Sequence, residues 1–170
     1  MNAVLENIMT RRSCRAFEQR HIPKDDLEKI LTAAVYAPTA MNRQTWRFTV
    51  LTDEEKIAEL AGAVGRAISR KDYDFYKPDA LVIVSNVKEN QNACADAGCA
   101  MQNMMLESHA LGVASCWINQ MKDTNGDAGV RALLDAYGIP ANHDVQCCLA
   151  LGYGKPAREI EHSMNAVHYV

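Results

Sequence analysis

The feature that most constrains the fold is a short apolar strand followed by a long helix that is apolar on nearly every side. Residues 80–85 (ALVIVS) form a continuous apolar run, which is typical of a strand buried on both faces of a sheet. Residues 92–110 follow, rich in alanine and methionine around the whole helical circumference. Such a helix belongs in the buried centre of a molecule. The pattern therefore predicts a sheet covered by helices.

Further strands and helices alternate along the chain. Strands are predicted at residues 46–51, 113–118 and 145–151. Amphipathic helices are predicted before residue 10, between Pro23 and Pro38, and over residues 53–69 and 130–137. Gly62 and Gly65 weaken the third of these predictions. The alternation indicates an α+β or α/β sandwich in one domain over residues 1–170, and residues 155–170 are expected to pack outside their own core.

Charge and hydropathy exclude several classes of partner. The 170 residues carry a formal net charge of −3, which favours neither nucleic acid nor an anionic surface. No apolar run of about 18 residues occurs, so no membrane partner is expected. The pair Arg11 and Arg12 precedes charged residues rather than the apolar stretch of an export signal, and we expect a cytoplasmic protein.

The six cysteines show neither zinc-ligand nor disulfide spacing. They are Cys14, Cys94, Cys99, Cys116, Cys147 and Cys148. None forms a C-x-x-C pair, and most lie in apolar surroundings. We therefore expect reduced thiols that pack as small hydrophobic residues, and no metal site.

Three segments carry residues suited to binding. The arginine segment (residues 11–17, RRSCRAF) places three guanidinium groups and a hydroxyl together, which suits a phosphate, although a solvated basic turn would look the same. The amide loop (residues 38–44, PTAMNRQ) sets neutral hydrogen-bonding side chains near Trp46. Such a mixture suits the polar edge of a planar heterocycle, and a simple capping loop is the alternative. The glycine segment (residues 151–158, LGYGKPAR) combines close turns with two cations, but it lacks the third glycine of a dinucleotide fingerprint.

Together these segments resemble the nitroreductase family of flavoproteins. Members of that family carry R-R-S-x-R-x-F, then A-P-S-x-x-N-x-Q-P-W, and this chain has RRSCRAF at residues 11–17 and APTAMNRQTW at residues 37–46. A strand like G-L-G-S-C-W-I (residues 111–118), a V-R-x-L-L…G-I-P stretch (residues 130–140) and A-L-G-Y (residues 150–153) follow in the same order. Thr39 and Thr45 stand where the family has serine and proline.

The resemblance implies an intertwined homodimer with a central mixed sheet flanked by helices and an FMN in a pocket lined by both subunits. The implied cofactor-binding residues are Arg11, Arg12, Ser13, Arg15, Pro38, Thr39, Asn42, Gln44, Ser115, Cys116, Trp117, Lys155 and Arg158. The amide loop would reach the flavin of the partner subunit, and residues 155–170 would lie across that partner.

The implied activity is transfer of reducing equivalents from NADH or NADPH through FMN to a nitroaromatic, a quinone or a similar planar acceptor, by a ping-pong mechanism. Since the flavin carries this chemistry, no catalytic side chain is expected. Cys116 is expected to pack rather than react, and His109 to be an ordinary polar residue. Two alternatives remain: a flavin-binding storage or sensing protein without catalysis, and an interaction domain without a ligand.

Overall fold

A four-stranded antiparallel sheet forms the centre of the protein. The structure, a computed structural model, describes residues 1–155 and 160–170. The strands are β1 (Trp46–Leu51), β2 (Ala80–Val87), β3 (Ala114–Ile118) and β4 (His143–Gly152), in the order β1-β2-β4-β3. The last strand, β4, inserts between β2 and β3, so all neighbouring strands run antiparallel. The expected sheet was mixed, whereas among the described residues the parallel contact between Ser13 and Ser115 is an isolated bridge outside the strand pairs.

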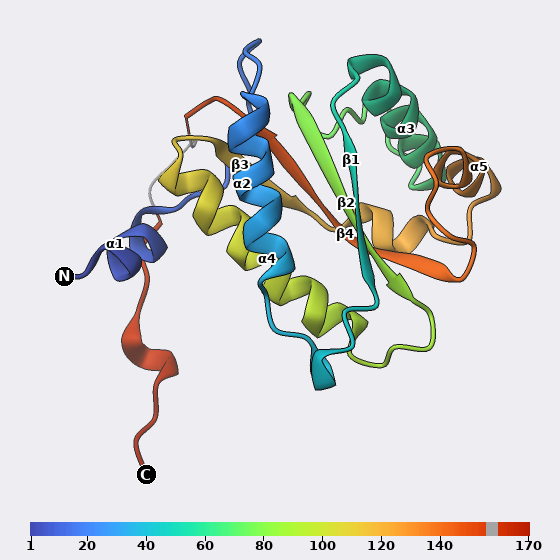
Figure 1. Cartoon of the computed structure of the whole chain (residues 1–170). Coiled ribbons are helices and arrows are strands. Elements are labelled where there is room, and N and C mark those ends of the chain that lie inside the picture. Colours follow the sequence, from blue (N-terminus) through green and yellow to red (C-terminus); the bar gives the residue numbers. More distant parts are fainter. Residues whose placement is uncertain (156–159) are drawn as a thin grey trace.

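Helices cover both faces of this sheet (Figure 1). On one side lie α2 (Lys24–Val35) and the central helix α4 (Ala93–Ala110), and on the other lie α3 (Glu54–Ala67) and α5 (Ala128–Ala136). Short 3-10 turns occur at η1 (Ala40–Asn42), η2 (Gln120–Thr124) and η3 (Met164–Ala166). The predicted α+β sandwich is thus confirmed.

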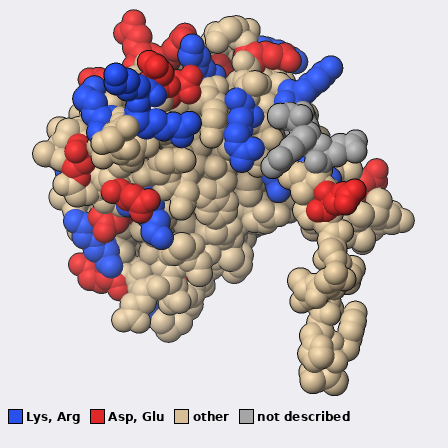
Figure 2. All heavy atoms as spheres, turned by 180° about the vertical axis from the view of Figure 1, so that it is seen from behind, with Lys and Arg blue, Asp and Glu red and all other residues tan. Residues whose placement is uncertain are grey.

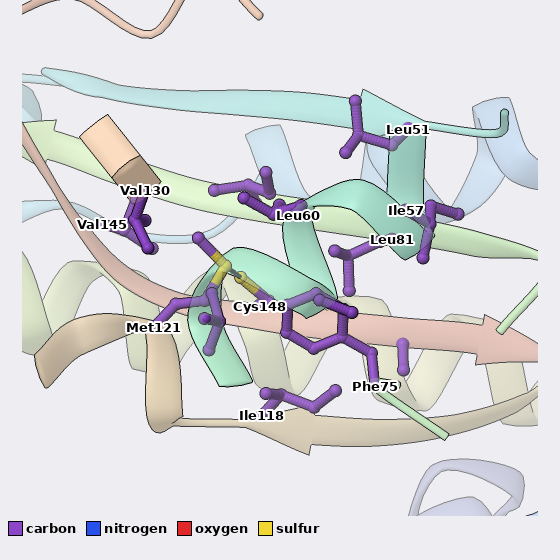
Figure 3. Close-up of a cluster of buried hydrophobic side chains, with 14 of the residues drawn as sticks. Leu51, Ile57, Leu60, Phe75, Leu81, Ile118, Met121, Val130, Val145 and Cys148 are labelled. Carbon is purple, nitrogen blue, oxygen red and sulfur yellow. Dashed lines mark hydrogen bonds between the residues drawn. The ribbon is translucent and has the colours of Figure 1, made fainter. Parts of the chain in front are cut away.

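The two faces of the sheet support two separate cores. Alternate residues of β2 divide between them: Leu81 and Ile83 face α3 and α5, whereas Val82 and Val84 face α2 and α4. Figure 3 shows the first core, in which Phe75, Leu60 and Ile118 surround the Cys148 thiol. Burial on both faces explains why residues 80–85 are continuously apolar.

The predicted α3 helix forms despite its two glycines, and one of them has a packing role. A Cβ at Gly65 would lie 2.9 Å from the carbonyl oxygen of Arg70 and 3.0 Å from Tyr73 Cβ. Glycine at this position therefore lets the segment after the helix fold back closely over α3.

The two ends of the chain contribute little to either core. Helix α1 (Ala3–Thr10) has no buried residue, and Val4, Leu5, Ile8 and Met9 are all exposed. Residues 160–170 stand away from the body (Figures 1 and 2), and their projecting part shows no charged side chain. Within the described residues, no helix is both long and apolar enough to cross a membrane.

Candidate functional site

The arginine segment is attached to the edge of the sheet by backbone hydrogen bonds. The amide of Cys14 donates to the carbonyl oxygen of Ser115 at 2.9 Å, and the amide of Glu18 donates to that of Tyr153 at 2.7 Å. The segment therefore crosses the ends of β3 and β4, where it meets the glycine segment. Two of the three predicted binding segments, the two that carry the predicted cations, are brought together in this way.

A hollow of about 240 Å³ opens beside these contacts. We call it the anion hollow, and its lining comprises Thr10, Arg11, Arg12, Cys14, His109, Gly112, Val113, Ala114, Ser115 and Gly154. Among the described residues, Arg11 Nε and Nη1 are buried without a hydrogen-bond partner. Burial, together with the nearby charge of Arg12, lowers the pKa of Arg11 from its ordinary value. A buried cation with free donors is costly unless an anion pairs with it, so this hollow is suited to a phosphate.

The neighbouring arginines have different environments. Arg12 Nη1 donates to the carbonyl oxygens of Met9 at 2.6 Å and Arg11 at 2.7 Å, so it also caps the end of α1. Arg15 is exposed, and its positive charge acts to lower the pKa of the Cys116 thiol. Ser13 sits at the bridge to Ser115.

Close packing between the arginine and glycine segments depends on Gly154. A Cβ at Gly154 would lie 2.9 Å from Cys14 Sγ, and that thiol donates to the carbonyl oxygen of Ala16 at 3.2 Å. Lys155, just beyond, is exposed, and its carbonyl oxygen accepts from Cys14 Sγ at 3.5 Å. Arg158 falls outside the described residues.

The β3 residues predicted to approach the flavin lie beside the hollow. Ser115 and Cys116 are buried, whereas Trp117 is partly exposed. Burial raises the pKa of the Cys116 thiol, and nearby Arg15 opposes that effect only in part. The thiol is therefore protonated at neutral pH, as a packed cysteine should be.

The amide loop lies at the opposite end of the sheet and has an unusual backbone. Met41, Asn42 and Gln44 all have positive φ angles, between 49° and 53°. Within the loop, the amide of Gln44 donates to Thr39 Oγ1 at 3.2 Å, and Gln44 Nε2 donates to Asn42 Oδ1 at 2.7 Å. Left-handed conformations at non-glycine residues persist only when the surroundings hold them, and they concentrate at binding sites.

Three polar side chains, which we call the clasp, hold this loop: Thr45, Asn90 and Asp96. Asp96 is buried at the start of α4, where Oδ1 accepts from the amide of Ala40 at 3.0 Å and Oδ2 from Asn90 Nδ2 at 3.0 Å. Asn90 Nδ2 also donates to Thr45 Oγ1 at 3.1 Å. The loop is thus held to one buried carboxylate, directly at Ala40 and through Asn90 at Thr45. The clasp was missed in the sequence, where Thr45 appeared only as a replacement for proline.

Within one chain, the anion hollow and the amide loop are far apart. His109 marks the hollow's end of α4 and Asp96 the loop's end. At 1.5 Å per residue these positions are about 20 Å apart along the helix. The structure thus gathers residues 11–15 with Ser115 and Cys116, places Trp117 two positions further along β3 near Gly98 of α4, and leaves Pro38, Thr39, Asn42 and Gln44 at a second location.

Comparison with known proteins identifies the family to which the chain belongs. The model of the Nitroreductase family matches residues 8–153, and the chain belongs to that family. A protein from Archaeoglobus fulgidus whose provisional name is NADH dehydrogenase/NAD(P)H nitroreductase is 31% identical over 165 residues, covering 94% of this chain and 90% of that protein.

Solved structures of nitroreductases are similar to this chain as well. A Bacteroides fragilis nitroreductase with bound FMN is 39% identical, covers 100% of both chains and superposes with a TM-score of 0.93. An FMN-dependent nitroreductase from Clostridium difficile is 25% identical over 97% of this chain and 98% of its own, with a TM-score of 0.77.

Proposed function

We propose that this protein is an FMN-dependent oxidoreductase that takes reducing equivalents from NADH or NADPH and passes them to a planar acceptor such as a nitroaromatic or a quinone. The observation that carries the proposal is the half-buried guanidinium of Arg11, whose buried Nε and Nη1 have no partner among the described residues. Arg11 lines a hollow of about 240 Å³, which is large enough for a phosphate group but not for a whole flavin. The donor set therefore fits the phosphate end of FMN.

Each group of residues has a separate task in this proposal. Arg11 would hold the phosphate, with the exposed Lys155 adding charge at the rim. Arg15 would stabilise negative charge at the pyrimidine edge of the ring, because a fixed cation there needs no reorganisation during reduction. Asn42 and Gln44 would hydrogen-bond the ring's polar edge, and the clasp would keep them in place.

Bound FMN would supply the redox chemistry, since its ring accepts a hydride from a nicotinamide and later passes electrons to the acceptor. The protein's part is to bind, orient and shield. We infer that donor and acceptor use one open face in turn, which gives ping-pong kinetics.

We further propose that the flavin site is completed by a second copy of the chain. The arginine segment and the amide loop are about 20 Å apart along α4, so one chain cannot readily bring Arg15 of the first and Asn42 and Gln44 of the second to one ring. Two copies in antiparallel orientation can bring unlike ends together. The exposed apolar residues of α1 and of the tail, including Val4, Ile8, Met164 and Tyr169, give such a pair surfaces to bury. Residues 155–170 would then lie across the partner.

The visible spectrum of purified protein tests the activity. We expect a flavin absorption that bleaches when NADH or NADPH is added without oxygen and returns when a quinone follows. A colourless protein that takes up no added FMN would refute the proposal. A flavin that neither nicotinamide bleaches would indicate a storage or sensing role instead.

A further inference from the structure

His109 occupies a position between two different environments at the end of α4. It is partly buried and lines the anion hollow together with Arg11 and Arg12. On its other side it lines a groove between α1 and α4 that contains Glu6 and Glu107. Besides these four charged groups, the Cys14 thiol is the titratable group that shares the hollow with His109 in the described part of the chain.

Hydrogen bonding determines which nitrogen of His109 can take up a proton. Thr10 Oγ1 donates to the carbonyl oxygen of Glu6 at 2.7 Å, so its lone pairs face the 2.9 Å contact with His109 Nε2. His109 Nε2 is therefore the nitrogen that carries the hydrogen in the neutral ring. Protonation then takes place at Nδ1, for which the described residues provide no hydrogen-bond partner.

The surroundings of His109 oppose its protonation while the hollow contains no anion. Burial lowers the pKa of His109, and the charges of Arg11 and then Arg12 lower it further. Arginine stays charged at any ordinary pH, so this opposition persists until an anion offsets the two guanidinium groups.

We propose that His109 is a protonatable member of the phosphate-binding hollow, so that FMN binding is coupled to uptake of one proton by this side chain. The proposal rests on the proposed FMN site and adds a regulatory property to it. A phosphate beside Arg11 cancels the positive field that His109 experiences and adds an attractive charge. The pKa of His109 is consequently higher in the complex than in the free protein.

The direction of the pH dependence follows from this difference. Below the pKa of free His109 the ring is protonated in both states, so FMN binding takes up no proton at this side chain. As pH rises through the higher pKa of the complex, the proton is lost and the attraction between the charged ring and the phosphate disappears. The contribution of His109 to FMN affinity should therefore fall with rising pH, by about tenfold for each unit by which binding raises the pKa.

Two variants separate His109 from other titrating groups. His109→Gln keeps a side-chain donor for Thr10 Oγ1 but cannot take up a proton. His21→Gln is the matched control, because His21 is exposed and bonds Asp79 Oδ1 at 2.7 Å, away from the hollow. The FMN dissociation constant of each apoprotein is measured by flavin fluorescence between pH 5.5 and 8.5, and the measurements are repeated with riboflavin, which lacks the phosphate.

We expect the FMN affinity of wild type relative to His109→Gln to fall as the pH rises, by about tenfold for each unit by which binding raises the pKa, and that of wild type relative to His21→Gln to stay constant. Riboflavin should show no difference among the three proteins. Superimposable FMN profiles for wild type and His109→Gln would overturn the proposal, as would a difference that persists with riboflavin. Failure of wild type to bind FMN at any pH would instead refute the flavin site itself.

A second measurement does not depend on whether a variant of His109 folds. The five histidines of the wild-type chain can be titrated by NMR with and without FMN. One histidine resonance should show a pKa that rises on FMN addition. The same resonance should still be present in His21→Gln, which shows that it does not belong to His21. Five unchanged titrations would contradict the proposal.

Discussion

Replacing Arg11 by alanine removes the guanidinium whose donors are buried and unpaired among the described residues. A hydrogen bond to a charged group contributes about 1.5–3 kcal/mol, so Arg11→Ala should weaken FMN binding by about one to two orders of magnitude. The control is Arg70→Ala, since Arg70 lies over the ring of Tyr73 and not at the anion hollow. Fluorescence titration of the apoproteins measures both. Equal affinity in the two variants would remove Arg11 from the site.

Cys116→Ser tests whether the thiol beside the hollow only packs. Because burial raises its pKa, the thiol is not a ready nucleophile. Placing a hydroxyl there should lower the free energy of unfolding by about 1–3 kcal/mol and leave nicotinamide turnover per bound flavin largely unchanged. Cys148→Ser, in the first core, is the control and should behave alike. Loss of turnover in Cys116→Ser alone, with flavin retained, would show that the thiol takes part in the reaction.

The individual site residues could be predicted from the sequence only where their chemistry was visible in the residue types. Three arginines around Ser13 indicated an anion site, and the structure adds that Arg11 has buried nitrogens without a partner among the described residues while Arg12 also caps α1. His109 looked like an ordinary polar residue, because its approach to the arginines depends on how α1 packs against α4. Gly154 was recognised as a turn residue, but its close contact with Cys14 is a tertiary feature.

At the scale of elements, the clasp should control how well the amide loop keeps its conformation. Thr45→Val preserves shape but removes the oxygen that accepts from Asn90 and donates to Asn86 Oδ1 at 2.7 Å. The buried donor left on Asn90 should cost about 1–3 kcal/mol of stability. Hydrogen exchange at the amides of Ala40 and Gln44 should accelerate. Thr49→Val on β1 is the control, and equal exchange in both variants would show that the clasp does not hold the loop.

Helices and strands were the most predictable level, because burial imposes a period on each of them. Residues 80–85 and 92–110 were correctly predicted to form the buried strand and the central helix, since each is apolar on the sides that the cores cover. Positive φ angles at Met41 and Gln44 could not be foreseen, because such residues adopt them only under tertiary constraint. The position of β4 between β2 and β3 likewise depends on long-range pairing that local pattern does not encode.

At the scale of the whole molecule, a single chain leaves apolar side chains exposed at both of its ends. Helix α1 has no buried residue, and Met164, Val167 and Tyr169 of the tail are exposed. Two halves of the expected flavin site lie at opposite ends of α4. A second copy would cover the apolar surfaces and join the halves, and FMN should then favour the dimer because it binds only there.

Mixing two defective variants tests this shared site most directly. One variant carries Arg11→Ala, and the other carries Asn42→Ala with Gln44→Ala; each alone should bind FMN poorly. In a mixed dimer, one site would combine the intact hollow of the loop variant with the intact loop of the Arg11 variant. The other site would carry both defects.

After subunit exchange at equal concentrations, half of the dimers should be mixed, so about a quarter of all sites should regain wild-type FMN affinity. Differently tagged chains confirm that mixed dimers form, and flavin content after dialysis counts the restored sites. Recovery of about a quarter is the result that the shared site predicts. Mixed dimers that hold no more FMN than the parent variants would contradict it, because a site built within one chain cannot be repaired by its partner.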